Sequence, residues 1–179
     1  FYVGSDYING GETAYGIMGI LMHGRAKVGI VTGSFKISEH NQRIAGFKKI
    51  IGQKYPGMEI VDIVESQDDD IIAFEATCEL LKRHPEIDAL FITAGGVYGA
   101  CRAVLSMQLQ GKIQIVSFDS APKTVEMLRQ QVIAVTIYQH PYTQGRKSMR
   151  LVFSCLVNGI EQKKEKYILK NEIKVLENL

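Results

Sequence analysis

The sequence is poor in cysteine and proline and has no tryptophan: it has three cysteines and four prolines in 179 residues. Cys78, Cys101 and Cys155 lie far apart and form no Cys-x-x-Cys pair, which argues against a disulfide framework and against a zinc site. We interpret them as small apolar side chains, and their presence favours a reducing compartment. The four histidines share no metal-ligand spacing, so we expect no metal site.

Long hydrophobic runs and an excess of charge are also missing. No apolar run approaches the length of a membrane span and no secretory signal is visible, so we expect no membrane partner. The chain begins at Phe1 on a short strand-like segment, and we expect further sequence upstream. With 21 Lys and Arg against 19 Asp and Glu, the net charge of +2 gives no argument for nucleic-acid binding by this segment.

What is present is a globular composition, with 46% hydrophobic and 22% charged residues, typical of one domain or two small lobes. Short apolar runs, which predict strands, alternate with amphipathic stretches, which predict helices. The predicted strands are 1–5, 27–32, 58–64, 88–93, 113–118, 132–138 and 167–176. The predicted helices are one ending near Met22, 41–54, 70–83, 97–110, one opened by Pro122, and 141–158, with a charged connection at 161–166. This alternation predicts an α/β fold with a doubly wound parallel sheet.

The first candidate site residues are polar side chains that follow buried strands. Asp119 and Gln139 stand where two neighbouring strands end, and ligands of open parallel sheets bind outside the carboxyl ends of the strands. Arg43 lies one turn into the helix that follows loop 33–40, and its guanidinium fork suits vicinal hydroxyls or a carboxylate. The alternative for Arg43, a solvent-exposed helix arginine, stays open at this point.

Two further loops have competing interpretations. Of the three acids Asp68–Asp70, one is expected to cap the following helix, which leaves two for a ligand or a cation. Loop 94–99, A-G-G-V-Y-G, lies where a phosphate loop would, but it lacks the G-x-G-x-x-G spacing and a following lysine. Its glycines could instead allow a close approach of backbone.

No nucleophile and base can be paired, and no G-x-S-x-G elbow occurs. Donors and acceptors without a nucleophile suit hydrogen bonding to a polyol. We therefore predict a binding protein rather than an enzyme, without catalytic residues or a cofactor.

Five segments in order resemble one known family. They are S-D-Y-I-N-G-G at 5–11, R-I-A-G-F at 43–47, H-P-E-I-D-A-L-F at 84–91, V-S-F-D at 116–119 and T-I-Y-Q-H-P-Y-T-Q-G at 136–145. Together they resemble the C-terminal part of the ligand-binding fold shared by type 1 periplasmic sugar-binding proteins and the lac-repressor family of transcription regulators. The resemblance covers essentially the whole chain.

The resemblance implies two α/β lobes that close over a ligand, with three crossings between them, near 3–7, 139–141 and 167–169. Residues 1–179 are then a partial ligand-binding domain. The C-terminal lobe comprises about 7–138 and 169–179, and helix 141–158 belongs to the other lobe, most of which is expected to precede this chain.

The resemblance also implies roles for single residues. Arg43 resembles the arginine that grips sugar hydroxyls, Asp119 the aspartate at a strand end, and Gln139 the hinge glutamine. Asp6 lies at the first crossing, near the pocket.

Two positions depart from the family pattern. Asp68 stands where relatives often have an aromatic that stacks on the sugar, which suggests a more polar or cationic ligand group. Ala94 stands where many relatives have a ligand-binding asparagine.

Three functions are carried forward. The first is the effector-binding domain of a cytoplasmic lac-repressor-type regulator that binds a sugar or polyol, forms a homodimer and contacts DNA only through an N-terminal domain outside this sequence. The alternative is a periplasmic or lipid-anchored sugar-binding protein of a transporter. The third, an enzyme that uses loop 94–99 for a phosphorylated substrate, has the least support.

Overall fold

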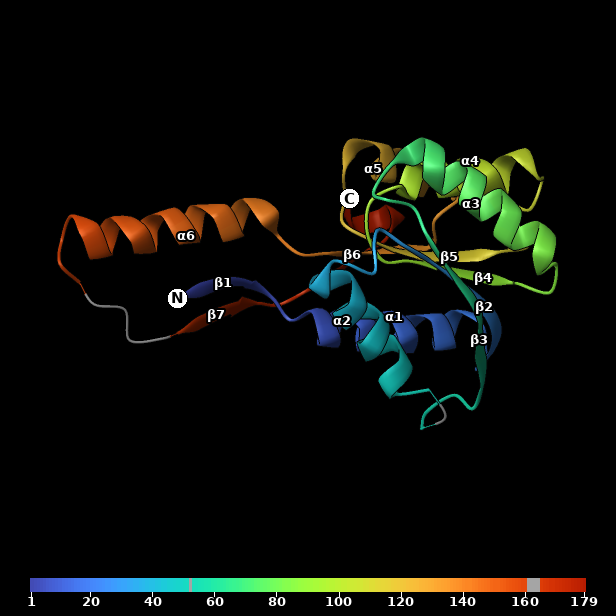
Figure 1. Ribbon diagram of the computed structural model, residues 1–179, viewed down its shortest axis with the longest axis horizontal. Helices are drawn as coiled ribbons and strands as arrows, with labels where there is room; N and C mark the ends of the chain where they lie inside the picture. Colours follow the sequence, from blue (N-terminus) through green and yellow to red (C-terminus); the bar gives the residue numbers. More distant parts are fainter. Residues whose placement is uncertain (52, 161–164) are drawn as a thin grey trace.

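The computed structural model describes residues 1–51, 53–160 and 165–179, and within them six strands form one central sheet (Figure 1). The order is β3-β2-β4-β5-β6-β8. The first five strands are parallel, and β8 pairs with β6 in the antiparallel sense. The bounds are β2 Arg25–Thr32, β3 Gly57–Glu65, β4 Ala89–Ile92, β5 Gln114–Phe118, β6 Val135–Tyr138 and β8 Glu172–Lys174. The predicted α/β class with a mostly parallel sheet is confirmed.

Helices cover both faces of the sheet, as expected for strands that are buried on both sides. The helices α1 and α2 lie on one face, and α3, α4 and α5 lie on the other (Figure 1). Their bounds are α1 Tyr7–Leu21, α2 Ser38–Lys49, α3 Asp70–Arg83, α4 Val97–Ser106 and α5 Pro122–Arg129.

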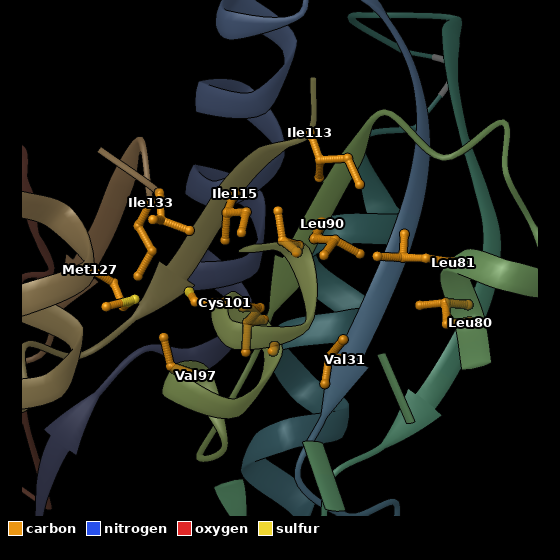
Figure 2. Packing of buried hydrophobic residues seen from close by; sticks show 14 of the residues in the cluster. Val31, Leu80, Leu81, Leu90, Val97, Cys101, Ile113, Ile115, Met127 and Ile133 are labelled. Atoms are coloured by element: carbon orange, nitrogen blue, oxygen red, sulfur yellow. The ribbon is translucent and has the colours of Figure 1, made fainter. Parts of the chain in front are cut away.

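Each face of the sheet has its own apolar core. Under α1 and α2 the core contains a group of aromatic rings, with Phe47 stacked on Phe91 at 4.7 Å and Phe91 next to Phe118. Under the other three helices the core is mainly aliphatic and includes Leu90 and Ile115 (Figure 2). These two cores hold the sheet rigid, so that the loops at its carboxyl edge have a fixed base.

The remaining elements extend away from this body. The strand β1 (Tyr2–Ser5) pairs in parallel with β7 (Lys166–Leu169), and this ribbon and helix α6 (Pro141–Leu156) project to one side (Figure 1). No residue of α6 is buried among the described residues, and Phe153 and Leu156 are 58% and 80% exposed. The assignment of this helix to another lobe stays a prediction. A short 3-10 helix, η1 (Leu176–Asn178), ends the chain.

The predicted final strand 167–176 is wrong, because the segment forms two strands in different sheets. β7 pairs with β1, and after Lys170 and Asn171 the chain joins β6 as β8. Asn171 Nδ2 donates to the carbonyl of Asp6 at 3.4 Å, which ties this change of direction to the start of α1. An apolar pattern of period two marks a strand but does not name its partner. Residues 161–164 of the predicted charged connection lie outside the described part.

Several element ends also differ from the prediction. Helix α1 begins at Tyr7, because Asp6 Oδ1 accepts the backbone N–H of Asn9 at 2.9 Å. Strand β6 begins only at Val135, because Val132 and Ile133 lie in a turn and insert into the core beside α5. Helices α2 and α4 end earlier than predicted, at Lys49 and Ser106.

Two glycines set the position of α2 against α1. A Cβ atom on Gly11 would lie 1.9 Å from the carbonyl oxygen of Arg43, and one on Gly46 would lie 2.0 Å from that of Ile8. The helices therefore touch backbone to backbone, and no larger residue fits there without displacing one of them. Because α2 carries Arg43, this contact fixes where the guanidinium reaches the sheet edge.

Candidate ligand-binding site

The candidate site lies where the strand order reverses. β2 lies between β3 and β4 in the sheet, and the helices that follow β2 and β4, α2 and α4, lie on opposite faces of it. Ligands of open α/β sheets bind in the crevice at such a point. The loops after the parallel strands of the sheet meet along this edge. The predicted site residues Arg43, Asp119 and Gln139 come together here.

Arg43 reaches from α2 across the end of the sheet. Its side chain is only 6% exposed, which excludes the interpretation as a solvent-exposed helix arginine. Nη1 donates to the carbonyl of Thr93, and Nη2 donates to Oε1 of Gln139 at 2.7 Å. The guanidinium also lies over the ring of Phe118, 4.3 Å from its centroid. The guanidinium is therefore held in one orientation by Thr93, Gln139 and Phe118.

Gln139 joins this arginine to the predicted hinge. Its backbone carbonyl accepts from Nε2 of Gln144 at 2.6 Å and from Oγ of Ser5 at 3.5 Å. Ser5 ends β1 and Gln144 lies in the first turn of α6, so the residue is tied to two of the predicted crossings. Its side chain is nearly buried, so it does not swing freely.

Asp119 is fixed in a left-handed backbone conformation, with φ of +63°, directly after β5. Its N–H donates to the carbonyl of Ile137 at 2.8 Å, and its carbonyl accepts from Oγ1 of Thr136 at 2.6 Å. Burial raises the pKa of its carboxyl, while the charge of Arg43 and the backbone N–H of Gln139 act in the opposite direction. A partly desolvated carboxylate is a strong hydrogen-bond acceptor for a ligand hydroxyl.

Two donors of this cluster have no partner among the described residues. They are Nε of Arg43 and Nε2 of Gln139, and both atoms are buried. Buried polar groups are almost always hydrogen-bonded, and an unpaired one costs roughly 1–3 kcal/mol. Two spare donors next to an acidic acceptor suit a group that both accepts and donates, as a hydroxyl does.

Asp68 is exposed and holds two loops together. Its Oδ1 accepts the backbone N–H of Gly95 at 2.8 Å, and a Cβ atom on Gly33 would lie 2.3 Å from the same oxygen. Nearby, Oγ of Ser66 donates to the carbonyl of Gly95 at 3.0 Å. The aspartate therefore fixes the loop that carries Ala94, and its ligand contact stays a prediction.

The other two acids of this loop also have partners in the chain, and the expectation that one of the three caps the following helix is confirmed. Asp69 caps α3 by accepting from the backbone N–H groups of Ile71 and Ile72. Asp70 pairs with Nζ of Lys123 at 2.9 Å. The described residues contain no cluster of three or more His, Cys, Asp or Glu side chains that could hold a metal ion.

The glycines of loop 94–99 serve packing. Gly96 has φ of +83° and precedes α4, and a Cβ atom on Gly99 would lie 1.9 Å from the carbonyl oxygen of Asp70. α4 thus approaches α3 backbone to backbone, as the alternative to a phosphate loop proposed.

Two pockets border the cluster through Asp119 and Gln139, and a third adjoins them through Tyr7; Arg43 lines none of the three. The central pocket, of about 440 Å³, is lined by Tyr7, Asp119, Ser120, Ala121, Tyr138, Gln139, Pro141 and Gln144. The side pocket, of about 550 Å³, is lined by Asp70, Ala94, Gly95, Gly96, Val97, Tyr98, Asp119, Ala121, Pro122, Lys123 and Thr124. A third, of about 530 Å³, is lined by Tyr2, Ser5, Asp6, Tyr7, Glu39, Gln42, Lys166 and Ile168. The structure therefore places Asp6 on the third pocket and Ala94 on the side pocket, apart from the central cluster.

Sequence reasoning missed two aromatic residues at this site. Tyr7 lines both the central and the third pocket, with its ring 5.4 Å from the guanidinium of Arg43. Phe118 supports the same guanidinium from the sheet. Tyr7 directly follows the predicted site residue Asp6, and Phe118 directly precedes Asp119, and this adjacency is the signal that could have found them.

The phenol of Tyr2, which lines the third pocket, stays neutral. Burial and the hydroxyl of Tyr7 raise its pKa to about 12.

Comparison with models of known protein families identifies the family of this chain. Residues 1–159 match the model of the periplasmic binding protein domain. The chain belongs to this family. A comparison with curated protein sequences finds no significant match. This periplasmic binding protein domain belongs to a family of non-enzymatic binding proteins, in agreement with the prediction that the chain is not an enzyme.

Solved structures of the family superpose well on the chain. GanP, a glucose-galactose binding protein from Geobacillus stearothermophilus, is 28% identical with a TM-score of 0.92, and the match covers 99% of this chain and 63% of GanP. An ABC transporter solute-binding protein from Burkholderia graminis in complex with D-arabinose is 25% identical with a TM-score of 0.92, covering 99% and 62%. One from Actinobacillus succinogenes with bound D-allose is 25% identical with a TM-score of 0.91, covering 98% and 62%. The chain thus spans less than two thirds of the length of these proteins.

Proposed function

We propose that this chain is the larger part of a sugar-binding protein that delivers its ligand to an ABC transporter. The observation that carries the proposal is the cluster of Arg43, Gln139 and Asp119, in which Asp119 and Gln139 line the central pocket and two buried donors lack a partner among the described residues. Adjacent hydroxyls of a sugar would accept from both donors and donate to the carboxylate. Tyr7, which lines the central pocket, supplies an aromatic surface of the kind that sugar sites use to pack against C–H groups, and the buried Phe118 supports Arg43 from below.

We prefer a role in a transporter to a role as a regulator because of how the similar solved structures are described. GanP is described as a glucose-galactose binding protein, and the proteins from Burkholderia graminis and Actinobacillus succinogenes are transporter components with a bound pentose or hexose. None of these three is described as a repressor. The effector domain of a lac-repressor-type regulator, with its predicted homodimer and DNA-binding partner, is the second candidate, because it would use the same pocket chemistry.

The two candidates imply different cellular locations. A transporter component acts outside the cytoplasmic membrane, whereas the regulator would be cytoplasmic. Cys101 suits either place, because it is buried and burial raises the pKa of its thiol to about 12, so it is unreactive. Fractionation of cells that express the full-length protein separates the candidates. Recovery in the cytoplasm together with specific DNA binding would reverse their order.

Sugar binding itself is tested on the full-length protein by isothermal titration calorimetry. The panel is D-glucose, D-galactose, D-arabinose and D-allose, with mannitol and glucose 6-phosphate as a polyol and an anionic sugar. A dissociation constant in the micromolar range or below for at least one neutral sugar supports the proposal, and it corresponds to about −8 kcal/mol. Absence of binding across the panel, confirmed by unchanged melting temperatures at millimolar sugar, would refute it.

None of the helices in the described part of the chain has the length and apolarity that crossing a bilayer requires.

A further inference from the structure

The side pocket adjoins the central pocket and is the larger of the two. Their volumes are about 550 and 440 Å³, and Asp119 and Ala121 line both. Small-molecule sites range over about 300–1,000 Å³, so each pocket alone has the volume of a ligand site. A ligand held at Asp119 therefore has unfilled space next to it.

The side pocket is open because residues 94–96 carry almost no side chain. Ala94 is buried at the end of β4, and Gly95 and Gly96 follow it. A Cβ atom on Gly96 would lie 2.6 Å from Cβ of Ala73, so the loop packs tightly on α3 and leaves its free volume on the pocket side. A larger residue at position 94 would take up part of the side pocket.

The walls of the side pocket combine apolar and polar groups. Val97 and Pro122 supply apolar surface, and Thr124 supplies a hydroxyl. Lys123 pairs with Asp70 at 2.9 Å, and its ammonium lies 4.7 Å from the ring centroid of Tyr98.

The charges around the pocket select the kind of group that it can take. Asp70 is paired with Lys123, and the charge of Asp119 is opposed by that of Arg43. A phosphate or carboxylate would have to displace one of these interactions, which disfavours an anionic extension. A neutral group with hydroxyls on its rim and C–H groups on its faces matches both kinds of wall.

We infer that the ligand is an oligosaccharide of at least two rings. One ring binds to Arg43, Gln139 and Asp119, and the ring joined to it occupies the side pocket against Tyr98 and Lys123. This inference rests on the proposed sugar-binding function and narrows its substrate class.

The test compares mono- and disaccharides on the full-length protein by calorimetry. The probes are glucose and galactose against maltose, cellobiose, lactose and melibiose. At least one disaccharide is expected to bind about tenfold more tightly than its component hexoses. Lys123→Ala and Tyr98→Ala should each remove most of that advantage and leave the affinity for the hexose within about twofold.

Two features keep the test decisive. Lys123 is exposed, so its substitution does not endanger the fold if Tyr98→Ala proves unstable. Lys112→Ala, at an exposed lysine that lines none of the three pockets, is the matched control. Hexoses that bind as tightly as every disaccharide, with no effect of either variant, overturn the oligosaccharide inference and leave sugar binding intact. Failure of every sugar to bind overturns the inference and the proposed function together.

Discussion

Replacement of Arg43 by alanine is expected to abolish most of the sugar affinity. In the structure the guanidinium is nearly buried, donates to the carbonyl of Thr93 and to Oε1 of Gln139, and lies 4.3 Å from the ring centroid of Phe118. The variant therefore removes the donor Nε proposed for the ligand and releases the side chain of Gln139. It also removes the positive charge that opposes the effect of burial on the pKa of Asp119.

The size of the loss follows from the kind of bond removed. A hydrogen bond to a charged group contributes about 1.5–3 kcal/mol, which corresponds to a rise in dissociation constant of about 10- to 150-fold. Arg43→Lys keeps the charge but not the planar fork, and it cannot span Thr93 and Gln139 together. We expect its affinity to lie between those of the wild type and Arg43→Ala.

The measurement is calorimetric titration of the full-length protein with its tightest sugar. Arg129→Ala is the control, because Arg129 is an exposed arginine in the last turn of α5 that lines none of the three pockets. Circular dichroism must show that each variant is folded at the titration temperature. Wild-type affinity in a folded Arg43→Ala protein would refute the assignment of the site.

The remaining predictions concern Asp119, the helix contact and α6. Because burial raises the pKa of Asp119, the sugar-free protein should gain stability relative to the unfolded chain as the pH falls through that raised pKa. Sugar affinity should decline over the same pH range. Asp119→Asn should raise the melting temperature at neutral pH and weaken sugar binding. Gly46→Ala should cost about 1–3 kcal/mol in urea unfolding, whereas Gly16→Ala, whose Cβ meets nothing within 4 Å, should stabilise by about 0.4–1 kcal/mol. Residues 1–179 on their own should self-associate through the exposed face of α6, and Phe153→Asp with Leu156→Asp should make them monomeric in sedimentation velocity.

Each of these three has a clear contrary result. An Asp119→Asn protein that melts at a lower temperature than the wild type would show that the attraction of the Asp119 carboxylate to the charge of Arg43 outweighs the cost of its burial. Equal unfolding free energies for the two glycine variants would contradict the backbone contact between α1 and α2. A wild-type chain 1–179 that is monomeric would contradict the association.

The alternation of elements was predictable because local signals coincide with the tertiary structure. α3 has the predicted bounds, since Asp69 caps its start and His84 with Pro85 ends it. The pairing of strands was less accessible. The split of the last predicted strand depends on which neighbours are free, β1 for Lys166–Leu169 and β6 for Glu172–Lys174, and no local pattern records that.

The candidate site was predictable as a set of residue types and not as a set of contacts. Arg43 bonds to groups that are 50 and 96 residues away along the chain. Strand-end polarity could place Asp119 and Gln139 on one edge, but it could not show that Gln139 orients the arginine. For Asp68 the residue type could not show that its carboxylate accepts the backbone N–H of Gly95, 27 residues away along the chain.

The position of Gln139 explains how binding at this edge could reach the rest of the protein. A ligand changes the arrangement of two lobes only if it interacts differently with each arrangement. Through its side chain Gln139 contacts Arg43, and through its carbonyl it accepts from Ser5 at the end of β1 and from Gln144 in α6. A sugar that engages the spare donor of Gln139 therefore acts on the point where two predicted crossings meet. The same side chain that recognises the ligand is thus joined to the segments that would have to move.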